Sequence, residues 1–119
     1  MIWAQEGSAK EFYDAQSDSD RAKMAALFNL LAASGTIRNR EKFKKLDDVN
    51  APGEHKAHRL FGFKSFQLRF IGEFRPKGEF VIAHATRKKK DDFAAADLIK
   101  AAIILSSEPT TPEEEEKTR

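Results

Sequence analysis

Apolar residues at spacings of three and four predict helices at the start of the chain. In the clearer segment, 21–34, the residues with this spacing are Met24, Leu27, Phe28 and Leu31. Asp18 or Ser19 is a suitable N-cap for this helix, and Gly35 is a suitable C-cap. Residues 9–16 form a shorter helical pattern. Because only a few polar residues separate the two segments, we expect an antiparallel helical hairpin.

A short stretch with mixed signals follows these helices. Residues 41–46, EKFKKL, have Phe43 and Leu46 at helical spacing, which predicts one further helical turn. The asparagine, proline and glycine within residues 47–54 then predict a loop.

The central part of the chain has the period of two that is typical of β-strands. In residues 64–72, Phe66, Leu68 and Phe70 alternate with other residues and are expected to face the core, so that Arg69 points away from it. A preceding strand at 56–63 would turn into it at residues 62–65. The apolar run 79–85, after the turn RPKG, is typical of a central strand, and the strands together predict an antiparallel meander.

The last pattern is an amphipathic helix over residues 91–107, with Asp91 and Asp92 near its start. Its expected apolar face consists of Phe93, Ala96, Leu98, Ile99, Ala102, Ile103 and Leu105. Residues 107–119 are polar and rich in glutamate, and we predict that they form a disordered acidic tail. Helices segregated from an antiparallel sheet define an α+β fold, here a single domain over residues 1–106.

Composition narrows the classes of function. The chain has 119 residues and no cysteine, which excludes disulfides, thiolate metal sites and a cysteine nucleophile, and which favours the cytoplasm. No run of about 18 apolar residues is present, so we expect a soluble protein without a membrane partner. His55, His58 and His84 lack the spacing of a zinc site, and no glycine-rich phosphate loop is found. We therefore expect neither a metal nor another cofactor.

Charge is distributed unevenly along the chain. The net charge is −2 up to Thr36, +9 from residue 37 to Lys90, and −5 beyond it. A basic middle part between acidic ends predicts a cationic surface that attracts a polyanion, although positive residues spread over several strands are equally consistent with ordinary solvated positions.

Several segments in order resemble a known family. They are KEFYDAQSDSDRAKMAALFNLLAASG, EKFKKL, HRLF, FQLRFIG, FVIAHATRKKKDDF and DLIKAA. Together they resemble the RelE/HigB superfamily of toxins from bacterial type II toxin–antitoxin systems, especially its phage-derived HigB-like branch, over roughly residues 8–106. In that branch an arginine-bearing strand precedes a strand that ends in H-G-F-x-K-K. The residues at these positions here are Arg69, His84, Lys88 and Lys89.

The resemblance implies a RelE-like fold, a helical hairpin on a small antiparallel sheet with a C-terminal helix. It also implies that the protein cuts messenger RNA on the ribosome and so inhibits translation, with a cognate antitoxin as its partner. The chain departs from the family pattern at Leu68, where an aromatic residue is usual, at Ala85 and Thr86, where glycine and phenylalanine are usual, and at Ala94, where proline is common.

Metal-independent RNA cleavage by attack of the 2′-hydroxyl needs a charge-stabilising group and proton transfer. Arginine suits the first task because it donates two hydrogen bonds to a phosphate, and the candidates are Arg69 and Arg87. For proton transfer the candidates are His84, His58, Lys56 and Lys88, and the sequence does not distinguish among them. The wider set expected to contact RNA is Lys56, His58, Arg59, Lys64, Lys89 and Lys90.

Each of these residues also has a purely structural interpretation. His84 at the end of an apolar strand is consistent with a core histidine, and the lysines after it with a solvated turn. The alternative function is a non-catalytic binding module of the RelE/ParE fold, either a gyrase inhibitor or an inactive phage-derived protein. The two functions differ in one geometric requirement. Catalysis needs Arg87 and Lys88 to face Arg69 across one sheet surface.

Overall fold

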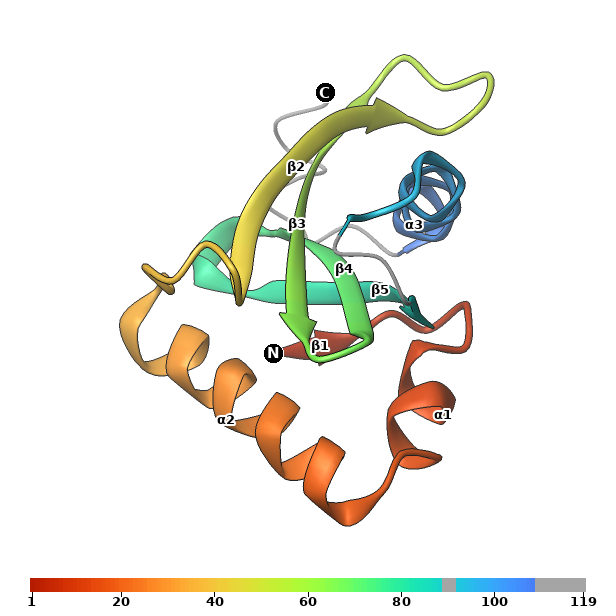
Figure 1. Ribbon diagram of the computed structural model, residues 1–119. Helices are drawn as coiled ribbons and strands as arrows, with labels where there is room; N and C mark the ends of the chain where they lie inside the picture. The colour runs from red at the N-terminus through yellow and green to blue at the C-terminus, as the bar shows by residue number, and fades with distance from the viewer. Residues whose placement is uncertain (89–91, 109–119) are drawn as a thin grey trace.

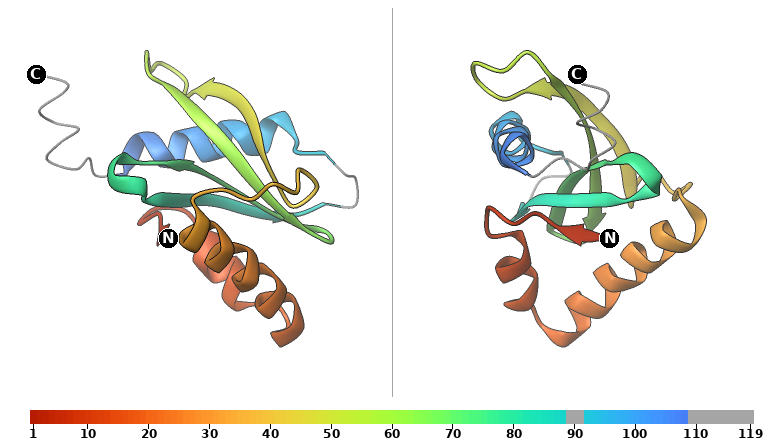
Figure 2. Two further views of the ribbon diagram at one scale, coloured as in Figure 1. Left: turned by 90° about the vertical axis from the view of Figure 1, so that its left-hand side faces the viewer. Right: turned by 180° about the vertical axis from the view of Figure 1, so that it is seen from behind.

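A computed structural model describes residues 1–88 and 92–108 (Figure 1). The strands are β1 (Ile2–Trp3), β2 (Phe43–Asn50), β3 (Ala57–Ser65), β4 (Leu68–Phe74) and β5 (Phe80–Arg87). The helices are α1 (Ala9–Asp14), α2 (Asp18–Ser34), α3 (Ala95–Ser107) and a short 3-10 turn, η1 (Pro76–Gly78). The sheet lies between α3 on one face and the pair α1 and α2 on the other, as Figures 1 and 2 show.

The five strands are ordered β1-β5-β4-β3-β2. The meander of β3, β4 and β5 is antiparallel, as predicted, and β2 extends it. The short β1 pairs with β5 in parallel, with Ile2 opposite Val81, so the sheet is mixed. The α+β class is therefore confirmed, whereas the expectation of a purely antiparallel sheet was wrong.

The N-terminal helices are confirmed, with two differences. The N-cap of α2 is Ser17, whose side chain accepts a hydrogen bond from the Asp20 amide, and Gly35 is the C-cap with φ 74°. The predicted antiparallel packing of the two helices is not found, because α1 and α2 diverge like the arms of a V (Figure 1). Aromatic side chains occupy the region between the helices and the sheet, where Trp3 contacts Tyr13 and Phe28.

Residues 41–46 do not form a helical turn. Phe43 begins the edge strand β2 and lies opposite Phe63 on β3, while its amide still donates to the carbonyl of Asn39 in the preceding turn. An irregularity between Lys45 and Asp48 shifts the register of β2. Phe43 belongs to the core beneath α2, whereas Leu46 packs against the core beneath α3. The spacing of three thus reflects two faces of a strand rather than one face of a helix.

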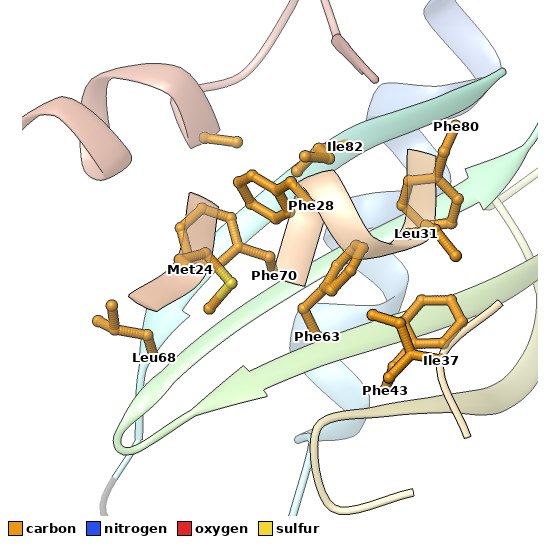
Figure 3. Packing of buried hydrophobic residues seen from close by; sticks show 11 residues of the cluster. Met24, Phe28, Leu31, Ile37, Phe43, Phe63, Leu68, Phe70, Phe80 and Ile82 are labelled. Carbon is orange, nitrogen blue, oxygen red and sulfur yellow. The ribbon is translucent and has the colours of Figure 1, made fainter. Parts of the chain in front are cut away.

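Two hydrophobic cores lie on the two faces of the sheet. Figure 3 shows the larger one, in which aromatic side chains from α2 and the strands point toward one another. Phe28 and Phe63, for example, meet edge to face with their ring centroids 5.0 Å apart. The smaller core joins Leu60, Ile71 and Val81 of the sheet to α3. As a result, residues 68–73 of β4 are all buried, including those that the alternating pattern assigned to solvent.

Helix α3 begins at Ala95, four residues later than the pattern indicated, and its buried face differs from the expected one. Ile99 and Ile103 are exposed, while Asp97 is buried. Of the predicted acidic tail, Ser107 still belongs to α3, and residues 109–119 lie outside the described residues, as does Asp91. Within the described part of the chain, no helix combines the length and apolar character needed to cross a bilayer.

A buried cluster of charged residues ties β3 and β4 to α3. His58 Nδ1 lies 3.0 Å from Glu73 Oε2, and Arg75 Nε lies 3.0 Å from Glu73 Oε1. Arg75 also donates a hydrogen bond to the carbonyl of Leu105, near the end of α3. All three side chains are nearly inaccessible to solvent. The arrangement pairs opposite charges that would be very unfavourable if buried singly.

We predict that Glu73→Ala destabilises the protein by about 3–5 kcal/mol, because it leaves Arg75 and His58 without their shared carboxylate in a buried site. Equilibrium unfolding in urea measures the change. The matched control is Glu79→Ala, which removes the same charge from an exposed position and should shift stability by less than about 0.5 kcal/mol. Equal losses in the two variants would contradict the prediction.

Candidate nucleic-acid interface

Arg69 is buried rather than directed away from the core. Only 2% of it is exposed, because α3 and the segment before it cover the face of β4 that was expected to meet solvent. Its Nη1 group donates hydrogen bonds to the carbonyls of Phe66, at 2.7 Å, and Leu68, at 3.0 Å. Its guanidinium carbon lies 5.9 Å from the centre of the Phe93 ring. The contacts fit a residue that holds the turn between β3 and β4.

Arg87 lies on the opposite face of the sheet from Arg69. In the β4–β5 register, Arg87 is opposite Leu68 and Arg69 is opposite Thr86. Directly opposite residues in antiparallel strands share a face, so Arg87 lies on the α2 side. There its guanidinium donates to Gln16 at 2.7 Å and to Gln67 at 3.3 Å. The two arginines therefore do not meet the requirement that they face one phosphate across one surface.

His84 and Lys88 come together through a residue that the sequence did not single out. His84 Nε2 lies 2.9 Å from Asp97 Oδ1, and Lys88 Nζ lies 2.9 Å from Asp97 Oδ2. Asp97 is in the first turn of α3, where the helix dipole favours an acid. That position was the only available signal, because the apolar pattern gave no reason to expect a buried carboxylate at this site.

The surroundings of Asp97 act on its pKa in opposite directions. Burial raises the pKa of the carboxyl, while hydrogen bonds from Lys88 and His84 and the charges of these groups lower it. The lowering effects prevail, so the pKa of Asp97 lies below its ordinary value of 3.8. Asp97 is therefore ionised at neutral pH and keeps both partners in place.

Several cations gather at one end of the sheet, which we call the cationic end. It consists of Lys42, Lys44, Lys64, Arg87 and Lys88. The Lys64 amide donates to the Lys42 carbonyl at 2.8 Å, and the Lys88 amide donates to the Gln67 carbonyl at 2.8 Å. These bonds bring the start of β2, the β3–β4 turn and the end of β5 together.

A hollow of about 350 Å³ opens at the cationic end. It is lined by Glu41, Lys42, Lys64 and Phe66. Lys44 lies on the same side, with its Nζ 5.7 Å from the centre of the Phe93 ring. This part of the surface therefore combines ammonium groups with the exposed ring of Phe66, while the ring of Phe93 lies buried beneath Lys44.

The other residues expected to contact RNA are not part of this end. Lys56 precedes β3 and Arg59 lies near its start, whereas Lys64 lies near its other end. His58 is buried against Glu73 and cannot reach a ligand on the surface. Lys89 and Lys90 lie outside the described residues.

No protein-family model, curated protein or solved structure matches this chain. The resemblance to RelE/HigB toxins stays a prediction. Among the residues that the structure describes, no group of three or more histidine, cysteine, aspartate or glutamate side chains is placed to hold a metal ion.

We predict that Asp97→Asn destabilises the fold by about 1–3 kcal/mol near neutral pH, because it removes the charge that both partners contact. Since the folded-state pKa of Asp97 is depressed, its contribution is present above pH 3.8 and is lost as the pH falls through the folded-state pKa. The difference in unfolding free energy between wild type and variant should therefore be larger at about pH 6 than at about pH 3.

The control for this comparison is Asp47→Asn at an exposed position of β2. Its effect should stay within about 0.5 kcal/mol at both pH values. A destabilisation by Asp97→Asn that does not shrink on acidification would show that the carboxylate charge has no part in holding the cluster.

Proposed function

We propose that this protein is a non-catalytic RNA-binding module that contacts the sugar-phosphate backbone at its cationic end. The observation that supports the proposal is the strand register, which gathers cations that are distant in sequence. Lys42 and Lys64 line one hollow, and Arg87 lies across the adjacent turn, where it contacts Gln67. Cations gathered at one end of the sheet offer positive charge to the phosphates of a nucleic-acid backbone.

Charge supports the choice of a polyanion as the partner. The segment from residue 37 to residue 90, which includes β2 to β5, has a net charge of +9. Of the nearby acids, Glu41 lines the hollow itself, and two others are engaged within the protein. Asp20 lies 3.9 Å from Arg87, and Asp97 is buried between His84 and Lys88. The remaining field at this end attracts anions and is expected to weaken as salt is added.

Binding without cleavage is favoured over an endonuclease because of Arg69. Arg69, which was expected to stabilise the phosphorane, is buried and bonded to backbone carbonyls, and Arg87 of β5 lies on the other face of the sheet. A phosphate on the surface of the cationic end would meet lysines and Arg87, not a pair of arginines. Lysines are point charges that hold a backbone without the fork geometry of arginine.

We predict that the double variant Lys42→Gln/Arg87→Gln binds an unstructured RNA oligonucleotide more weakly than wild type. If both side chains contact phosphates, the negative slope of log affinity against log salt should become less steep by about 1.4. Lys56→Gln/Arg59→Gln removes the same two charges at the other end of β3 and serves as the control. Fluorescence anisotropy at several salt concentrations measures both slopes. Equal changes in the two variants would indicate attraction by net charge alone.

A second candidate is a type II toxin that cuts messenger RNA on the ribosome and is held inactive by an antitoxin. The His84–Asp97–Lys88 cluster favours it. A carboxylate that fixes one nitrogen of an imidazole is the arrangement by which many enzymes orient a general base, and a lysine beside it supplies positive charge. His84 is 16% exposed at its side chain, so a ligand has limited access to it.

Production of the chain alone in a bacterium separates the two candidates. As a binding module, it should leave the positions of messenger-RNA ends unchanged relative to the His84→Ala variant, because no bond is cut. Growth arrest with codon-phased cuts that disappear in His84→Ala would establish the toxin instead. Arrest with intact messages and blocked DNA replication would indicate a gyrase-directed relative. Sequencing of RNA ends and measurement of DNA synthesis provide the readouts.

A further inference from the structure

Phe66 occupies an unusual position at the turn between β3 and β4. The alternating pattern placed it in the core, yet it is 80% exposed. Its φ is 58°, the left-handed region, where a bulky side chain is uncommon, and no other non-glycine residue described in the structure has a positive φ. Glycine or asparagine is the usual residue at such a position. A large exposed ring on a strained backbone is therefore a candidate for a functional contact.

The turn that carries Phe66 is held from both sides. Buried Arg69 donates a hydrogen bond to the Phe66 carbonyl at 2.7 Å. On the other side, the Lys88 amide donates to the Gln67 carbonyl at 2.8 Å, and Arg87 donates to the Gln67 side chain. The backbone beneath the ring is thus fixed before any ligand arrives, which limits the entropy lost on binding.

The surroundings of Phe66 specify the chemistry of the ligand. The ring lines the same hollow as Lys42 and Lys64, whose two ammonium groups outnumber the one carboxylate there, that of Glu41. A flat apolar surface beside two ammonium groups matches a ligand with a flat apolar ring beside an anion, and a nucleotide has this arrangement in its base and phosphate. An acidic peptide would use the lysines but would give the exposed ring no planar partner.

We infer that Phe66 stacks on an unpaired base of a single-stranded nucleic acid while Lys42 and Lys64 contact the neighbouring phosphates. The inference rests on the proposed function and adds selectivity for single strands to it. Bases within a duplex already stack on one another and leave no face open to a protein ring. The cations attract both forms, whereas the Phe66 ring favours the unpaired one.

The test compares Phe66→Leu with Phe66→Tyr on three probes: an unstructured RNA oligonucleotide, a DNA strand of the same sequence, and an RNA duplex of the same length. Loss of stacking on one base should weaken the binding of Phe66→Leu to the RNA strand by roughly 5- to 150-fold. The DNA strand should lose affinity in the same proportion because the ring contacts the base. Duplex affinity should not change, and Phe66→Tyr should retain wild-type binding.

A spectroscopic readout complements the affinities. Because the chain has one tryptophan, Trp3, the variant Phe66→Trp adds a second indole at the proposed contact. Stacking on a base should quench the added fluorescence, while wild type, with Trp3 alone, gives the background. Absence of quenching at saturating RNA would overturn the inference.

The outcomes separate this inference from the proposed function. If Lys42→Gln/Arg87→Gln weakens binding and Phe66→Leu does not, RNA binding stands and the stacking role fails. An equal loss on strand and duplex, or a loss on RNA without a loss on DNA, also overturns the stacking role. If wild type binds none of the three probes, the proposed function fails, and the inference fails with it.

Discussion

Burial of β4 on both faces is the constraint on which the other features of this structure depend. Helix α2 and its aromatic partners cover one face, and α3 covers the other. A polar side chain on this strand therefore has to find its partners inside the protein. Arg69 does so through backbone carbonyls, and Glu73 does so through His58 and Arg75. Arg69, which the sequence suggested as a catalytic residue, and Glu73 therefore both stabilise the fold.

The sequence predicted the elements whose signals are local. Helix α2 with its cap at Gly35, and the strands β3, β4 and β5, follow from periodicity and from turn residues that act over a few positions. Strand β2 was not predicted because its conformation depends on pairing with β3, which its own residues do not encode locally. The two residues of β1 are too few to show any period, so their parallel pairing with β5 also went undetected.

The candidate site was predicted only in part, for a related reason. Lys64, Arg87 and Lys88 were expected to contact RNA or to act in its cleavage, and they lie at the cationic end. The period of two also placed Arg69 and Leu68 correctly on different faces of β4. Periodicity gives no information, however, on whether another layer covers the face that carries Arg69. Asp97 shows the converse case. A charged residue on a helix is usually solvated. The burial of Asp97 is favourable only because His84 and Lys88, in and directly after β5, contact its carboxylate.

Strand β2 is an edge of the sheet, and its charged residues have a further consequence for the behaviour of the protein in solution. An edge strand offers unpaired backbone groups to the edge of another molecule, and lysines on such a strand oppose this association. Lys44 and Lys45 follow directly after Phe43, an aromatic residue with high strand propensity. Neutral residues at these positions would leave an apolar edge open to self-association. The same cations would then serve both to attract a polyanion and to keep separate copies of the chain apart.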